Sequence, residues 1–380
     1  MIKKQACLFL FLLSMILFPQ LAAAKVQEYS LEPNDINPFI ENNVRDRFSY
    51  SGLAAFYNDV SAYIVDTKGI KKINTEAYTV KPDQVLALVG HYKMLILQDV
   101  VGVVSFEENR LLWHKNDTEN PVSRMGKTRA QLLLKSDLDQ LPQYFQKIKY
   151  AHLWAPFRLL CLGIEAILLW LNTIHSFGWG ITIILLSLLF KLFILPANIL
   201  LTRAQRKVSH VQARLAPELE YIKANFTGEE AHQKFMVVHK QQCVTPFYNL
   251  KPLLLTLVPI PFWIAIFNVL SEMDLIAGHP FLWIEDLAYP GAIYHLGFHI
   301  PLLGTSINLL PILMTFLTIL AALIHQNKII STKELHKQKR NLYFMAAGFF
   351  LLFYPFPSAM VLYWTFANIW QLIQQRFVHI

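Results

Sequence analysis

Residues 178–202 read GWGITIILLSLLFKLFILPANILLT, an apolar stretch that is interrupted by one charge, Lys191. A helix needs roughly 20 apolar residues to cross a hydrocarbon core of about 30 Å, so this stretch predicts a membrane span. Four further segments have a similar composition, near 250–270, 305–326, 341–356 and 358–378. The pattern predicts a mainly α, polytopic membrane protein with five core transmembrane helices, the last two of which form a tight hairpin at Pro357.

The composition agrees with this class. Hydrophobic residues make up 54% of the 380 residues and charged residues 16%, which is too apolar for a disordered chain. A formal net charge of +8 would favour nucleic acid if it lay on one soluble face. The excess basic residues lie instead at the N-terminus and in loops between apolar segments, so we expect no nucleic-acid partner.

Basic residues in these loops set the expected orientation. The 203–249 loop contains Arg203, Arg206, Lys207, Arg214, Lys223, Lys234 and Lys240. The 327–340 loop contains Lys328, Lys333, Lys337, Lys339 and Arg340. The 271–304 loop has no lysine or arginine and contains Glu272, Asp274, Glu285 and Asp286. We therefore expect both basic loops and the C-terminus in the cytoplasm, and the acidic loop outside.

The 203–249 loop also predicts a cytoplasmic helical hairpin. Apolar residues recur at helical spacing at Val208, Val211, Leu215, Leu219 and Ile222. Thr227-Gly228-Glu229-Glu230 then supplies a turn and a capping box for a second helix. Its positive charge fits contact with anionic membrane lipids.

Residues 1–24 have the pattern of a signal peptide, in which Lys3 and Lys4 precede an apolar run and Ala22-Ala23-Ala24. An uncleaved anchor helix is the alternative, because the apolar run is long for a signal. Residues 25–155 change to balanced polarity with β-branched and aromatic runs, which predicts a small β-rich extracytoplasmic domain.

Residues 156–177 are apolar but include Arg158 and Glu165. A charge of each sign is expensive in hydrocarbon, so this segment predicts an amphipathic helix on the outer membrane face rather than a span.

Lys191 is the candidate functional residue. It lies 11 residues after Gly180 and 11 before Thr202, so it is roughly 16 Å from each end of its span. No Asp or Glu occurs within the five segments, and an unpaired cation at this depth indicates a function. Its helix bears a polar stripe of Ser187, Lys191, Asn198 and Thr202, and the last segment bears a second stripe of Thr365, Asn368, Gln371 and Gln375. Two such helices would line a hydrated recess, although ordinary interhelical hydrogen bonds explain single members equally well.

Other functions remain open at this point. A solute or ion transporter would use the same polar recess, although internal repeats are not evident. Ser187 and Lys191 have the i, i+4 spacing of a Ser–Lys protease, but nothing nominates an oxyanion site. Cys7, Cys161 and Cys243 lie in separate regions, and no metal or nucleotide motif occurs, so we expect no metal and no cofactor.

From about Phe157 to the C-terminus, the chain resembles the YidC/Oxa/Alb family of membrane protein insertases. The resemblance rests on the order of several motifs: Gly178-Trp179-Gly180, Leu195-Pro196, Val244-Thr245-Pro246, Phe281-Leu282-Trp283, Leu310-Pro311 and Phe356-Pro357-Ser358 through Tyr363-Trp364.

The resemblance implies a non-enzymatic insertase and chaperone of the bacterial inner membrane, with a hydrophilic groove open to cytoplasm and lipid. Its partners would be newly made membrane proteins, a Sec-type translocon and lipids. The groove arginine of the family falls on Lys191, and Trp364 is a candidate client contact. Lysine keeps the charge but loses the planar fork of arginine. Phe247-Tyr248-Asn249 replaces the usual Gly-Gly pair, and the tail lacks the basic extension of ribosome-holding members.

Overall fold

The computed structural model describes residues 26–46, 49–50, 52–81, 83–100, 102–114, 128–174, 177–241, 250–301, 303–324 and 332–377. The predicted signal segment, Cys7, Cys243 and Phe247-Tyr248-Asn249 lie outside these residues. The chain forms two compact units. The first comprises Met1–Ile183, Ala265–Pro311 and Leu351–Leu362, and the second comprises Ile184–Ile264, Ile312–Phe350 and Tyr363–Ile380.

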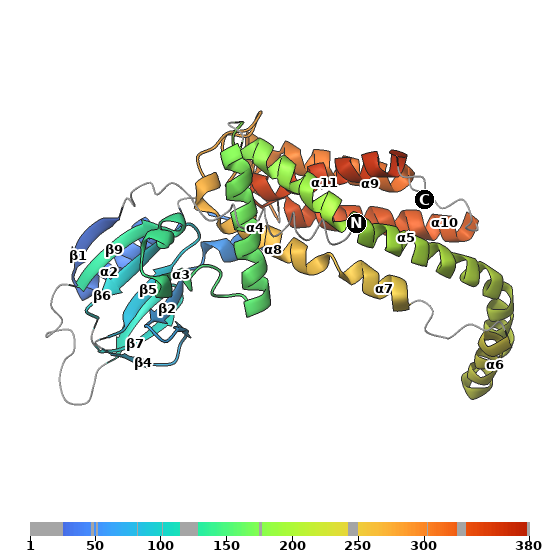
Figure 1. The fold of residues 1–380 in the computed structure, drawn as a ribbon, viewed down its shortest axis with the longest axis horizontal. Coiled ribbons are helices and arrows are strands. Elements are labelled where there is room, and N and C mark those ends of the chain that lie inside the picture. The colour runs from blue at the N-terminus through green and yellow to red at the C-terminus, as the bar shows by residue number, and fades with distance from the viewer. Residues whose placement is uncertain are drawn as a thin grey trace, which may run out of the picture. The chain divides into compact units, whose positions relative to one another are not determined.

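The first unit contains the predicted β-rich domain. Its larger sheet is antiparallel, with the strand order β1-β9-β6-β5-β2-β3 (Figure 1). These strands are β1 (Gln27–Leu31), β2 (Ser61–Val65), β3 (Ile70–Ile73), β5 (Val85–Val89), β6 (Lys93–Gln98) and β9 (Thr128–Leu134). A smaller sheet contains β4 (Tyr78–Val80), β7 (Gly102–Glu107) and β8 (Arg110–His114).

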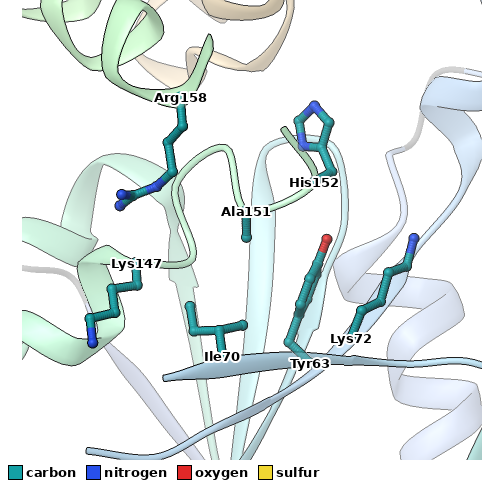
Figure 2. Close-up of a pocket in the computed structure, with 7 residues that line it drawn as sticks. All are labelled: Tyr63, Ile70, Lys72, Lys147, Ala151, His152 and Arg158. Atoms are coloured by element: carbon teal, nitrogen blue, oxygen red, sulfur yellow. The ribbon is translucent and has the colours of Figure 1, made fainter. Parts of the chain in front are cut away.

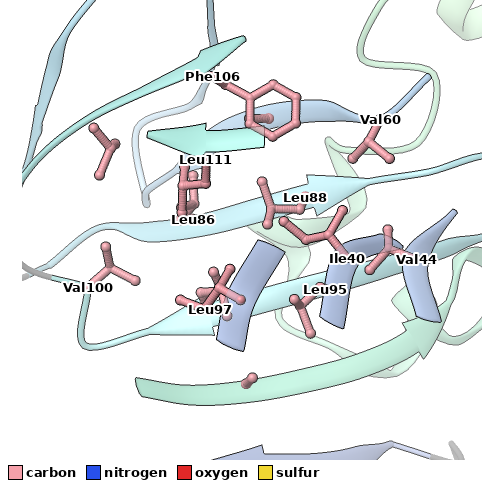
Figure 3. Close-up of a cluster of buried hydrophobic side chains, with 14 of the residues drawn as sticks. Ile40, Val44, Val60, Leu86, Leu88, Leu95, Leu97, Val100, Phe106 and Leu111 are labelled. Carbon is pink, nitrogen blue, oxygen red and sulfur yellow. The ribbon is translucent and has the colours of Figure 1, made fainter. Parts of the chain in front are cut away.

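Both faces of the larger sheet are covered. Leu86 and Leu88 of β5 point into one apolar cluster with Ile40 and Val44 (Figure 3). Ala87, between the two leucines, points into a second cluster on the other face. Because side chains alternate along a strand, an apolar run such as 85–89 marks a strand that is buried on both sides.

Short helices provide the cover on each face. On one side lie α2 (Pro33–Phe39) and the π-helical turn η1 (Ile40–Val44), and on the other η4 (Lys135–Gln140) and α3 (Gln143–Gln146). A further 3-10 helix, η2 (Gly52–Asn58), precedes β2.

The rest of the chain is mainly helical. Its helices are α4 (Ala155–Ile174), α5 (Trp179–Asn225), α6 (Gly228–Gln241), α7 (Leu250–Leu257), α8 (Ile260–Glu272), the 3-10 helix η5 (Asp274–Ile276), α9 (Leu309–Ile324), α10 (Thr332–Phe353) and α11 (Ser358–Phe377). Within the described residues, three stretches are long and apolar enough to cross a membrane: Ala155–Ile174, Trp179–Val208 and Leu253–Glu272. Leu309–Leu320 and Arg340–Phe353 are shorter apolar helices, so the five-helix core stays a prediction.

Helix α4 coincides with the segment predicted to lie on the membrane surface. By length and composition it also qualifies as a span. Its two charges have partners: Glu165 forms an ion pair of 2.9 Å with Lys149, and Arg158 donates to the carbonyls of Lys149 and Gln146. Because both charges have partners, the free-energy cost of charge in hydrocarbon does not distinguish a membrane span from a helix on the membrane surface. The surface position stays a prediction.

The predicted 250–270 span corresponds to Leu253–Glu272, which is long and apolar enough to cross a membrane, but its helix is interrupted. Helix α7 ends at Leu257 and α8 begins at Ile260. The sequence supplies the reason in Pro259, which lacks an N–H and disfavours helical backbone at the preceding Val258.

The predicted 305–326 span begins too early. Residues Gly304–Asn308 form β11, which pairs antiparallel with β10 (Ala292–Ile300), and the helix starts only at Leu309. Asn308 ends the strand because its backbone N–H donates to the Tyr354 hydroxyl at 3.1 Å and its amide donates to the Tyr354 carbonyl at 2.9 Å.

The two predicted hairpins have helical counterparts. Helix α5 continues past the apolar stretch to Asn225, and Gly228, with φ of +62°, begins α6 after a short turn. Helices α10 and α11 are joined by the residues from Tyr354 to Pro357, as expected from the proline.

The segment from Leu287 to Tyr289, which we term the carbonyl bridge, joins the β-rich domain to the start of α11. The carbonyls of Leu287 and Tyr289 accept the backbone N–H groups of Ala359 and Ser358, at 2.8 and 2.9 Å. The carbonyl between them, that of Ala288, accepts the hydroxyls of Tyr50 and Tyr92, at 2.9 and 3.1 Å. Two of the N–H groups that a helix N-terminus leaves without an intrahelical acceptor are thereby satisfied.

Candidate functional site

Lys191, on α5, is hydrogen bonded to the last helix. Its ammonium group donates to the side-chain carbonyl oxygen of Gln371, on α11, and both side chains are half-buried. Among the residues that the structure describes, no Asp or Glu forms an ion pair with Lys191. A neutral amide orients the ammonium group without cancelling its charge.

Ser187, one turn before Lys191, also contacts α11. Its hydroxyl donates to the Ile184 carbonyl at 2.6 Å and accepts the indole N–H of Trp370 at 3.0 Å. The residue is 1% exposed. The first half of the predicted α5 stripe therefore meets α11 at two successive turns, through Trp370 and Gln371.

Asn368 connects α11 to a third helix. Its amide donates to the Thr318 hydroxyl, on α9, at 2.8 Å, and that hydroxyl donates to the Met314 carbonyl at 2.8 Å. The predicted α11 stripe thus divides between two neighbours, because Gln371 contacts α5 and Asn368 contacts α9.

The other predicted polar residues have local or buried positions. The Thr202 hydroxyl donates to the backbone carbonyl of Asn198 at 2.9 Å, a bond within one helical turn. Thr365 is 1% exposed, and the side chain of Gln375 lies outside the described residues. No described hydrogen bond brings Asn198 or Thr202 to α11.

Trp364, the predicted client contact, lies among aromatic rings. Its ring centroid is 5.3 Å from that of Trp263, on α8, and 5.6 Å from that of Phe349, on α10. Its side chain is half-buried, and its role toward a client stays a prediction.

Sequence reasoning missed two of these residues, Trp370 and Thr318. Trp370 escapes a search for polar stripes, because tryptophan counts as apolar although its indole N–H is a donor. Thr318 is a single threonine in an apolar helix, so it forms no periodic pattern. Trp370 was detectable as a donor beside Gln371, in the helix that already bore the second stripe. For Thr318 we find no signal.

The described residues contain no group of three or more His, Cys, Asp or Glu side chains placed to hold a metal ion. The arrangement around Lys191 is therefore a set of hydrogen-bonded polar side chains in apolar helices, with a cation at its centre.

Comparison with known proteins gives a family for this half of the chain. Residues 170–380 match the model of a family described as 60Kd inner membrane protein. A "Membrane protein insertase YidC" of Treponema denticola is 30% identical over 211 residues, which cover 53% of this chain and 34% of that protein. One of Chlorobaculum parvum is 28% identical over 213 residues, which cover 55% of this chain and 34% of that protein.

The chain thus spans about a third of the length of the curated relatives that it matches. A solved structure described as an active YidC insertase crystal structure with the first transmembrane domain resolved aligns over 84% of this chain and 83% of that chain. The alignment has 16% sequence identity and a TM-score of 0.39.

Proposed function

The chain belongs to the 60Kd inner membrane protein family, the YidC/Oxa/Alb family, and from this premise we propose that it inserts integral membrane proteins and helps them fold. The matched relatives are named as insertases and not as enzymes. The clients are newly made membrane proteins, and a Sec-type channel and membrane lipids are the expected partners.

The observation that supports this function best is the partner of Lys191. The Gln371 amide is neutral, so it does not cancel the charge of the ammonium group, and no carboxylate of the described residues forms an ion pair with it. The proposed groove lies on the face of α5 that bears Lys191, Asn198 and Thr202 and on the face of α11 that bears Gln371. Of the other predicted lining residues, Ser187 and Thr365 are buried and Asn368 contacts α9.

The mechanism follows from the energetics of charge in hydrocarbon. Moving an acidic segment through intact hydrocarbon is prohibitive, because its charges lose hydration without gaining partners. A hydrated recess shortens the dry distance, and the fixed charge of Lys191 attracts carboxylates there. Hydrophobic partitioning of the client then supplies the driving force, and the membrane potential favours outward movement of negative charge.

We place the β-rich domain outside the cytoplasm and the α5–α6 hairpin and C-terminus inside it. The excess of Lys and Arg in the 203–249 and 327–340 loops supports this orientation.

The first prediction concerns Lys191 itself. In vesicles containing the purified protein, Lys191→Arg retains insertion of a client with an acidic translocated segment, because the charge is kept. Lys191→Ala and Lys191→Glu reduce it by about tenfold or more, because 1.4 kcal/mol of lost attraction suffices for that factor. Protease protection of the translocated segment measures insertion.

Arg203→Ala is the matched control, because it removes an exposed charge of the same sign from the same helix, 12 residues from Lys191. It should insert the client as the unmodified protein does. Full activity of Lys191→Glu would exclude the electrostatic mechanism.

Two other functions become outcomes of related measurements. Saturable flux of a small solute without client insertion would indicate a transporter. A Ser–Lys protease requires Ser187 to be activated by Lys191, yet the Ser187 hydroxyl donates to the Ile184 carbonyl and the Lys191 amine to Gln371. An unchanged client length with Ser187→Ala removes that alternative.

A further inference from the structure

The first unit contains a pocket of about 370 Å³ with a basic lining (Figure 2). Seven residues line it: Tyr63, Ile70, Lys72, Lys147, Ala151, His152 and Arg158. Four of these residues have basic side chains, and none of the seven is a carboxylate. The proposed insertion mechanism does not use this pocket.

Arg158 provides a fixed positive charge. It lies in the first turn of α4, where its Nε donates to the Lys149 carbonyl at 2.9 Å and its Nη2 donates to the Gln146 carbonyl at 3.0 Å. Two carbonyl groups hold the guanidinium in place but do not neutralise it. Figure 2 shows the side chain extending from α4 toward the segment that bears Lys147.

The other basic residues differ in whether a carboxylate lies close enough to neutralise them. His152 lies with its Nε2 3.3 Å from the Glu272 carboxylate and 3.1 Å from the Asn268 amide oxygen. Lys72 and Lys147 are exposed, and the described residues give neither of them a carboxylate partner. The free positive charge of the pocket is therefore that of Lys72, Lys147 and Arg158.

The pocket also contains a neutral donor and an apolar wall. Tyr63, on β2, is 5% exposed, and burial raises the pKa of its hydroxyl, which keeps the proton available for a hydrogen bond. Figure 2 shows this hydroxyl pointing toward the loop of Ala151 and His152 and the Lys72 side chain beside it, with its amine directed away from that loop. Ile70 and Ala151 add apolar surface. This combination fits a phosphate group that is attached to a carbon skeleton.

The residues next to the pocket indicate where such a group comes from. Trp154 is 74% exposed and Leu159 is 67% exposed. Phe157 lies between them in the sequence, and its ring centroid is 6.4 Å from that of Trp154. Tryptophan beside exposed apolar residues is typical of a segment at the level of lipid headgroups.

We propose that this pocket binds the phosphate of an anionic phospholipid headgroup in the outer leaflet through Arg158, and that Lys72 and Lys147, at opposite ends of the pocket, add electrostatic attraction (Figure 2). The bound headgroup would hold the β-rich domain and the start of α4 at the membrane surface. The proposal does not depend on insertase activity.

The test uses the full chain purified in a mild detergent and isothermal titration calorimetry. The probes are the water-soluble dioctanoyl forms of phosphatidylglycerol and phosphatidylcholine, and inorganic phosphate. We expect saturable binding of phosphatidylglycerol and weaker binding of phosphatidylcholine. Lys72→Ala combined with Lys147→Ala should weaken phosphatidylglycerol binding about 30-fold, given the usual contribution of two basic residues at an anionic surface.

Lys68→Ala combined with Lys81→Ala is the control, because both lysines are exposed in the same domain, do not line the pocket, and change the net charge equally. Arg158 is left unchanged, because its hydrogen bonds hold the chain between Gln146 and Lys149. Equal binding of the two lipids, or equal weakening by the control pair, would overturn the proposal. Binding of inorganic phosphate alone, lost with Lys72→Ala and Lys147→Ala, would overturn the lipid as the source.

Discussion

At the scale of single residues, the partner of Lys191 determines what this side chain can do. An ammonium group has three N–H donors, and Gln371 accepts one of them. The described residues provide no acceptor for the other two, so we expect these donors to bind water or a client carboxylate. Had the partner been a carboxylate, the pair would be neutral and its attraction for acidic segments would vanish.

Substitutions of Gln371 can therefore distinguish the effect of the Lys191 charge from the effect of its hydrogen bond to α11. Gln371→Glu keeps a partner for Lys191 but neutralises it, so insertion of a client with an acidic translocated segment should fall by about tenfold or more. Gln371→Met removes the hydrogen bond and leaves the charge, so it should keep most of that activity. The readout is insertion of two clients that differ only in whether the translocated segment is acidic or neutral.

A client with a neutral segment serves as the internal control, because both variants should insert it equally. Acidic and neutral clients affected to the same extent by Gln371→Glu would contradict a role for the charge of Lys191.

The sequence predicted a polar face on α5, of which the structure brings Ser187 and Lys191, but not Asn198 or Thr202, into hydrogen bonds with α11. Ser187 and Lys191 stand out because polar residues are rare in an apolar helix. Trp370 does not, because an indole is apolar over most of its surface, and only the three-dimensional contact identifies its N–H as the donor to Ser187.

At the scale of elements, α4 is tied to the β-rich domain by a buried ion pair. Lys149 and Glu165 are 2.9 Å apart, and their side chains are 9% and 12% exposed. Removing one partner from such a pair leaves a buried charge without compensation, whereas replacing both with apolar residues is often neutral.

Lys149→Met alone should therefore lower the free energy of unfolding by about 3–5 kcal/mol. The double change Lys149→Met and Glu165→Leu should recover most of this loss. Thermal unfolding of the purified full chain measures both changes. Arg129→Ala is the control, because Arg129 pairs with Asp99 at the surface, where the side chains are 74% and 57% exposed. It should change the free energy of unfolding by less than about 1 kcal/mol. A double variant no more stable than the single one would show that this pair cannot be replaced by apolar packing.

The limits of prediction at this scale lie where tertiary contacts override local patterns. The predicted span included Thr305 to Asn308, yet these residues form β11, because β10 and Tyr354 supply hydrogen-bond partners. The break at Pro259 was predictable, since proline interrupts helices in isolation as well.

At the scale of the whole molecule, a buried histidine makes the β-rich domain sensitive to pH. His91 is 5% exposed and stacks between Tyr57 and Tyr92, with ring centroids at 4.7 and 3.9 Å. Burial lowers the pKa of His91 below its ordinary value of 6.5, although the nearby Asp46 acts in the opposite direction. Its Nε2 has no hydrogen-bond partner among the described residues.

The unfolded chain therefore takes up a proton near pH 6.5, and the folded chain does so only at lower pH. The contribution of His91 to stability is complete above that pH and is lost as pH falls below it, by up to about 1.4 kcal/mol per pH unit. Thermal unfolding at pH 7.5 and pH 5.5 should show a larger loss for the unmodified chain than for His91→Phe, which keeps a ring but cannot titrate. Equal losses would contradict this role of His91.

The strand order of this domain was beyond sequence reasoning. The alternation of side chains identifies buried strands such as β5, but it does not tell which strands pair. Here β1 lies beside β9, about a hundred residues later in the chain, and a pairing of that separation leaves no local pattern.

The carbonyl bridge has a mechanical consequence. Since all three of its consecutive carbonyls are engaged, no peptide plane between Leu287 and Tyr289 can turn without breaking a bond to Tyr50 and Tyr92 or to the first turn of α11. A force applied to the β-rich domain through Tyr50 and Tyr92 is therefore transmitted to Ser358 and Ala359, the first residues of α11, without first extending a loop.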